Sequence, residues 1–199
     1  IKLKRGTWHP KIKIKNREVM LVSSGPKLND YKSEIEKYIK DKKPLVIALN
    51  PLIKINKNLI DMYIACNPLR LMADAELYKY IKSPLVVPKS LLSKKIIEKF
   101  KNIKLLDFGV GIKDEKFEFY KNYTLVPKLY NVAYALSVAT CGKGSRILFA
   151  GFDGYGPEDK RTKIVDDLFF LYSSHKKSKK IISVTPSSYN FTKTSIYAL

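Results

Sequence analysis

Residues 19–49 constrain the fold of this chain more than any other stretch. Residues 19–22 form an apolar run typical of a buried strand, and Ser-Ser-Gly-Pro at 23–26 ends it abruptly. Glycine allows a sharp turn and proline fixes φ where a helix can begin. Residues 28–40 then carry apolar side chains at close to helical spacing, and residues 44–49 form a second apolar run. The stretch therefore predicts a strand–helix–strand unit.

The turn at the end of the first strand is a candidate binding corner. The first N–H groups of a helix have no intrahelical partner, so a helix that begins here can bind a phosphate or carboxylate. Gly25 would let the backbone come close to such a ligand. Gly-Pro also marks ordinary turns, so the plain turn stays open as an alternative.

The rest of the chain continues the alternation of strands and helices. Strands are predicted at 61–66, 84–87, 103–108, 146–151 and 181–185, and helices at 73–81, 90–101, 127–139 and 163–173. Residues 109–122 are expected to form an irregular link, which either covers a site or makes a satellite core. This pattern predicts an α/β protein: residues 19–199 form a single Rossmann-like domain, with a mostly parallel central sheet and helices on both faces.

Residues 1–18 precede that domain. Isoleucine or leucine alternates with lysine in two short pieces of this segment, which favours an edge strand with lysines guarding its exposed face. The chain begins with Ile1, and we expect residues 1–18 to be an edge strand or a linker from an N-terminal region outside the sequence. That region would be a covalently fused catalytic domain.

The chain is strongly basic, with 38 lysine and arginine residues against 18 acidic ones and a net charge of +20. Nearly all of the basic residues are lysines, whereas nucleic-acid readers favour arginine. Two interpretations follow, a solvated lysine surface or a true anionic partner. Cys66 and Cys141 are isolated and predict reduced thiols. We expect a cytoplasmic protein without a transmembrane segment, and leave peripheral contact with the inner face of the membrane open.

Polar residues follow several predicted strands where the chain leaves the sheet. Asn50 and Asn67 are each followed by proline, and Arg70 comes soon after the second of them. A carboxamide there can bind a base or ribose edge, or it can simply start a turn. Asp153 lies among glycines at the end of another strand, where open α/β sheets bind ligands, although an Asx turn would use the same residue.

These junctions together resemble a Rossmann-like superfamily of bacterial sialyltransferases and flagellin-glycosylation accessory factors. The landmarks are Ser-Ser-Gly-Pro-Lys-Leu at 23–28, Ala-Leu-Asn at 48–50, Ala-Cys-Asn-Pro at 65–68, Ala-Gly-Phe-Asp-Gly-Tyr at 150–155 and Thr-Pro-Ser-Ser at 185–188. Their order and spacing carry the resemblance. A closer similarity is to the C-terminal domain of HMG-CoA-lyase-like aldolases of the 4-hydroxy-2-oxovalerate aldolase type, which are encoded in surface-polysaccharide loci.

The resemblance implies a site for a CMP-linked sugar, which would be a substrate, with no cofactor. No metal is expected either, because the sequence has no Asp-x-Asp cluster. The resemblance places the nucleotide against Ser23, Ser24, Gly25, Pro26, Lys27, Asn50, Asn67, Asp153 and Tyr155. Further candidates for contact with a sugar or an anion are Arg70, Asn131, Ser188 and Tyr189. Catalytic residues stay unassigned, because the general-base histidine of the sialyltransferases has no counterpart here. His175 follows a helix inside a lysine run and is not expected to replace it.

Three hypotheses follow from the sequence. The first is a glycosyltransferase-like domain that binds a nucleotide-activated sugar and serves surface-glycan assembly. The second is an accessory module with the same pocket and no chemistry of its own, fused to an aldolase-type enzyme. The third, nucleic-acid binding, rests on charge alone, and we do not expect it.

Overall fold

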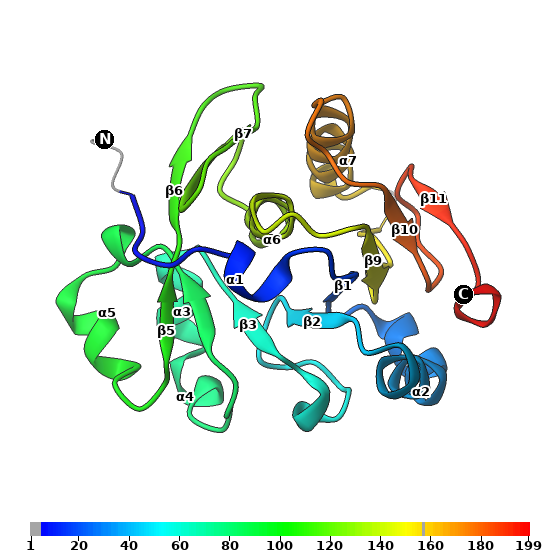
Figure 1. Cartoon of the computed structure of the whole chain (residues 1–199), viewed down its shortest axis with the longest axis horizontal. Helices are drawn as coiled ribbons and strands as arrows, with labels where there is room; N and C mark the ends of the chain where they lie inside the picture. Colours follow the sequence, from blue (N-terminus) through cyan, green and yellow to red (C-terminus); the bar gives the residue numbers. More distant parts are fainter. Residues whose placement is uncertain (1–4, 157) are drawn as a thin grey trace.

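The computed structural model describes residues 5–156 and 158–199. Its centre is a parallel sheet of eight strands in the order β11-β10-β9-β1-β2-β3-β4-β5 (Figure 1). The strands are β1 (Val19–Val22), β2 (Leu45–Ala48), β3 (Met62–Ile64), β4 (Leu85–Val87), β5 (Leu105–Asp107), β9 (Ile147–Ala150), β10 (Ile181–Ser183) and β11 (Thr192–Lys193). The predicted α/β class, with a parallel sheet and helices on both faces, is confirmed.

The strand order reverses direction beside β1. The chain first adds β2 to β5 on one side of β1 and then returns to place β9 on the other side. Val19 pairs with Leu45 of β2 and with Ile147 of β9, so the three strands run in register. Open α/β sheets bind ligands at such a switch point, beyond the carboxyl ends of the strands.

Two layers of helices cover the sheet, because alternate residues of each strand face opposite sides. Met20 and Val22 of β1 pack with α2 (Lys32–Lys42), α3 (Pro68–Ala73), α4 (Ala75–Tyr78) and α5 (Lys94–Lys99). Val19 and Leu21 pack on the other side with α6 (Asn131–Cys141) and α7 (Lys160–Ser173). Figure 1 shows α6 and α7 on one side of the sheet and α2 and α4 on the other.

Short helices complete several of the connections. A 3-10 helix, η1 (Pro26–Tyr31), precedes α2, and η2 (Lys57–Leu59), η3 (Lys89–Leu91) and η4 (Ile196–Ala198) lie in loops. Of the helix expected at 73–81, the structure keeps only the short α4, and α3 ends where the predicted helix was to begin. Among the described residues, no helix is long and apolar enough to cross a bilayer.

The prediction of an edge strand near the N-terminus is wrong for residues 11–14, which form the helix α1 (Lys11–Ile14); residues 1–4 lie outside the described part of the chain. Pro10 has helical dihedrals and its carbonyl accepts from the N–H of Ile14. A strand would turn Ile12 and Ile14 to the same face. In the helix Ile14 is fully buried, whereas Ile12 is 77% exposed.

The link at 109–122 is also more regular than expected. It contributes β6 (Gly109–Ile112) and β7 (Glu118–Phe119), which join β8 (Tyr123–Val126) in a separate three-stranded sheet. Val110, Phe117 and Phe119 are buried in the core that α6 and α7 cover. The segment therefore belongs to the packing of the domain. Glycines at 109 and 111 hid the strand, because they give no alternation of side chains.

Candidate functional site

A cleft of about 390 Å³ lies at the carboxyl edge of the sheet, at the switch point. Its size is at the lower end of the usual range for ligand sites, about 300 to 1,000 Å³. The loops after β1, β2 and β9 line it, together with the beginning of α6. The lining residues that sequence reasoning had named are Ser23, Ser24, Gly25, Asn50, Arg70, Asn131, Asp153, Tyr155 and Tyr189.

The loops after β1 and β9 are bonded to one another inside this cleft. The N–H of Gly25 donates to the carbonyl of Gly151 over 2.9 Å, and the N–H of Lys27 donates to Oδ2 of Asp153 over 2.7 Å. Gly151 has a φ of 73°, which favours glycine, and its N–H donates to the hydroxyl of Thr185 beyond β10. Three neighbouring strands therefore fix the shape of this corner.

The expected phosphate cradle at the start of η1 is already filled by protein atoms. The N–H groups of Gly25 and Lys27 are engaged as described, the N–H of Leu28 donates to the carbonyl of Gly25, and Pro26 has no N–H. The Asp153 carboxylate lies where a bound anion would be expected. A phosphate that approached this turn would be repelled by the carboxylate. An anionic group of a ligand would therefore have to bind in another part of the cleft.

Gly25 serves a close approach between two loops of the protein. A Cβ built on it would lie 2.5 Å from Oδ1 of Asp153 and 2.5 Å from the carbonyl oxygen of Gly151. Its φ of −58° is open to any residue, so space is what demands glycine here. The expected reason for this glycine, room for a ligand, is therefore replaced by room for Asp153.

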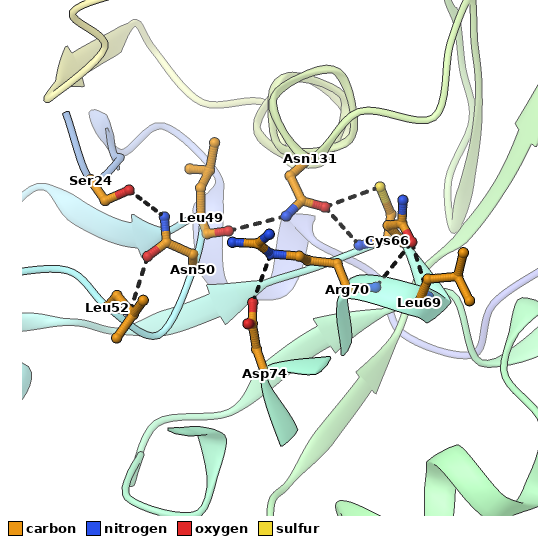
Figure 2. A network of polar contacts seen from close by, with 10 residues as sticks. Ser24, Leu49, Asn50, Leu52, Cys66, Leu69, Arg70, Asp74 and Asn131 are labelled. Atoms are coloured by element: carbon orange, nitrogen blue, oxygen red, sulfur yellow. Dashed lines mark hydrogen bonds and ion pairs between the residues drawn. The ribbon is translucent and has the colours of Figure 1, made fainter. Parts of the chain in front are cut away.

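Asn50 and Asn67 both bond to the local backbone. Oδ1 of Asn50 accepts from the N–H of Leu52, and its Nδ2 donates to the hydroxyl of Ser24 (Figure 2). Oδ1 of Asn67 accepts from the N–H groups of Leu69 and Arg70 and caps α3. Asn50 still lines the cleft, whereas Asn67 is not among its lining residues. Both side chains therefore stabilise the turn or helix start that follows them, as the alternative to ligand binding in the sequence analysis proposed.

Asn131 ties the start of α6 to the ends of two strands. Its Nδ2 donates to the carbonyl of Leu49 beyond β2, and its Oδ1 accepts from the N–H of Cys66 beyond β3 (Figure 2). Burial raises the pKa of the Cys66 thiol, which therefore stays protonated close to the same oxygen. Tyr130, the N-cap residue of α6, makes no side-chain cap hydrogen bond in the described structure, and the first N–H groups of this buried helix, which have no intrahelical partner, begin at the cleft.

Arg70 is the one positively charged residue among the described residues that line the cleft. Its Nε donates to Oδ2 of Asp74 over 2.9 Å, and its side chain is 67% exposed. Figure 2 shows its guanidinium group directed toward Asn131 and Asn50. The free edge of this group can bind a phosphate or carboxylate with two parallel hydrogen bonds.

Aromatic side chains form much of the remaining wall. Tyr155 is at the rim, with the guanidinium of Arg161 4.1 Å from its ring centre. Tyr189 is buried, and burial raises the pKa of its hydroxyl, which therefore stays protonated and able to donate. Tyr130 is the residue just before α6 and also lines the cleft. Such rings can stack on a base or a sugar.

Some predicted residues lie beside the cleft, and some lining residues were missed. Pro26, Lys27, Asn67 and Ser188 are outside the lining, although the N–H of Ser188 donates to the carbonyl of Asp153. The missed residues include Asp74, Tyr78 and Tyr130. Asp74 is four positions after Arg70, the spacing of a helical ion pair, and that signal could have found it. Tyr78 gave no signal, because its position depends on how α4 packs.

Replacing Asn131 with alanine should lower the free energy of unfolding by about 2 kcal/mol, because it leaves the N–H of Cys66 and the carbonyl of Leu49 without their partner. Urea unfolding measures the change. The matched control, Asn102→Ala, alters an exposed asparagine and should cost less than about 0.5 kcal/mol. Equal losses in the two variants would show that Asn131 does not hold α6 to the strands.

Within the described residues, no group of three or more His, Cys, Asp or Glu side chains is placed to hold a metal ion. Comparisons with protein-family models, with curated proteins and with solved structures found no match to this chain. The resemblance to sialyltransferases, aldolase C-terminal domains and flagellin-glycosylation factors therefore stays a prediction. The fold and the cleft are what the structure itself establishes.

Proposed function

We propose that the cleft binds a nucleotide-activated sugar, CMP-linked as the sequence resemblance implies, and that the domain acts in glycosyl transfer for surface-glycan assembly. One observation carries the proposal: the loops after β1 and β9 meet at the switch point of a parallel sheet, next to a cleft that Arg70 lines. This is the place where open α/β folds bind nucleotides.

The charges of the cleft suggest how such a ligand would lie. The phosphate would bind the guanidinium of Arg70 and the N–H groups at the start of α6, the electropositive parts of the lining. The hydroxyl groups of a ribose or sugar would face the side chain of Asp153, which lines the cleft. Tyr155 and Tyr189 would pack against a base or a sugar ring.

A second candidate, the accessory module without chemistry, is supported by the state of the carboxylates. Glycosyl transfer needs a general base that reaches the acceptor hydroxyl. In the described lining, Asp74 is paired with Arg70 and Asp153 accepts from the N–H of Lys27. His9 and His175 both lie outside this lining. A module that holds a donor for a fused enzyme would need no base.

Calorimetric titration with CMP, CDP, UDP and GDP tests the binding site. We expect saturable binding of CMP, with cytidine, which has no phosphate, binding more weakly. If none of these nucleotides binds at millimolar concentration, the proposal fails for both candidates. Incubation with a CMP-activated sugar then separates them: release of CMP identifies an enzyme, whereas binding without turnover identifies the module.

A further inference from the structure

A second and larger hollow lies at the opposite edge of the sheet from the cleft. This groove has a volume of about 1130 Å³, and its walls are α1, the segment 119–121, the end of α6 and the turn after α7. Asn16, Ser145 and Lys179 belong to its lining and precede β1, β9 and β10. It is therefore at the amino ends of the strands. In Figure 1, α1 lies beside α6, and a Cβ built on Gly142, the residue after α6, would meet the side chain of Ile14.

The charge in this groove is of one sign. The described lining contains no aspartate or glutamate. It contains seven lysines, which are Lys11, Lys15, Lys121, Lys143, Lys176, Lys177 and Lys179. Six of these are exposed and Lys179 is half-buried. Charges of one sign in a hollow reinforce one another and attract counter-ions more strongly than a scattered surface does. Part of the lysine excess, for which a solvated surface and an anionic partner were both left open, is thus gathered in one place.

The charge of the groove also acts on a neighbouring imidazole. His175 lies beside the groove, with its ring packed edge-on against Phe119. Burial lowers the pKa of His175, and the charges of Lys177 and Lys176 lower it further, while Glu118 opposes them. A polyanion bound to the two lysines would remove their share of this shift, so the pKa of His175 reports on occupation of the groove.

An aromatic surface joins the lysines. Tyr120 lines the groove and is 41% exposed, and its ring stacks on Tyr123 with the centroids 4.2 Å apart and the planes 5° from parallel. The guanidinium of Arg5 lies 5.8 Å from the ring centre of Tyr123. Aromatic rings beside a cationic groove are how many proteins hold single-stranded nucleic acid, with phosphates on the lysines and bases on the rings.

We propose that this groove binds single-stranded nucleic acid, without sequence specificity. Lysine supplies point charges for phosphates and lacks the planar fork that reads base edges, so the lining suits backbone contact. A bilayer is flat and binds protruding surfaces of a protein. These lysines instead line a hollow, which can hold a single nucleic-acid strand. The site is separate from the cleft and does not depend on the function proposed for it.

Fluorescence anisotropy with a labelled oligothymidylate of about 20 nucleotides tests the proposal. We expect binding that weakens steeply with salt, with a slope of log Kd against log salt of about 3, which corresponds to four phosphate contacts at about 0.7 each. The double variant Lys176→Glu, Lys177→Glu should weaken binding at least about tenfold at physiological salt. Lys94→Glu, Lys95→Glu on α5 makes the same change of net charge at two exposed lysines outside the groove lining and should weaken it much less.

Two further measurements distinguish the groove from general attraction to a basic protein. Tyr120→Leu leaves every charge in place and should weaken binding about tenfold through lost stacking. By NMR, the pKa of His175 should rise when the oligonucleotide binds. Equal losses in the two double variants, or an unchanged pKa of His175 at saturation, would overturn the proposal. So would binding to phosphatidylserine vesicles with no binding to the oligonucleotide, which would identify a membrane surface instead.

Discussion

Replacing Gly25 with valine should lower the free energy of unfolding by about 3 kcal/mol. The new Cβ would lie 2.5 Å from the backbone oxygen of Gly151 and 2.5 Å from Oδ1 of Asp153, so the loops after β1 and β9 must move apart. The hydrogen bonds that the N–H groups of Gly25 and Lys27 donate to Gly151 and Asp153 would be strained at the same time. Urea unfolding, followed by circular dichroism, measures the loss.

Gly156→Val is the matched control for this substitution. A Cβ on Gly156 meets nothing within 4 Å, and the residue is exposed. We expect its free energy of unfolding to stay within about 0.5 kcal/mol of the original. If Gly25→Val were as stable as Gly156→Val, the two loops would not be packed as described, and the glycine would serve a ligand after all.

Replacing Arg70 with alanine should weaken CMP binding by about tenfold to a hundredfold, since a hydrogen-bonded ion pair with a phosphate contributes about 1.5 to 3 kcal/mol. The substitution also leaves Asp74 unpaired in the lining, where its charge would repel the phosphate. Calorimetry with CMP measures the change. The side chain is 67% exposed, so we expect little loss of stability.

Three comparisons assign this effect to the phosphate. Cytidine, which has none, should bind Arg70→Ala and the unaltered protein equally well. The double variant Arg70→Ala, Asp74→Ala should recover part of the loss, because it removes the repelling carboxylate. Lys79→Ala deletes a positive charge outside the cleft lining and should have no effect on CMP. An equal loss for cytidine and CMP would place the phosphate elsewhere.

The central strands of the sheet could be predicted from the sequence because they are buried on both faces. Continuous apolar runs such as Val19–Val22 and Ile147–Ala150 allow few other interpretations. The alternating segment at 11–14 gave a wrong prediction, because Pro10 and the two isoleucines fit a single helical turn as well as they fit a strand. β6 was missed for the opposite reason, since its glycines show no pattern at all.

The position of the candidate site in the fold could be predicted from the sequence, whereas most of the contacts that its side chains make could not. Ser24, Asp153 and Arg70 follow three different strands, and the fold rule alone brings them to one edge. Sequence does not tell whether a strand-end asparagine faces a ligand or caps the next helix. Asn67 caps α3, and Asn131 bridges two strands, because backbone groups nearby lack other partners. Such competition is settled by local geometry, which residue spacing does not reveal.

The carboxylate of Asp153 at the start of η1 has a consequence for the polarity of binding. In many α/β folds the turn after the first strand receives the charged end of the ligand. Here that position already holds a negative charge, whereas the positive features of the lining are Arg70 and the start of α6. We therefore expect a bound nucleotide to lie in the opposite orientation, with its uncharged part at the turn after β1 and its anionic end at the start of α6.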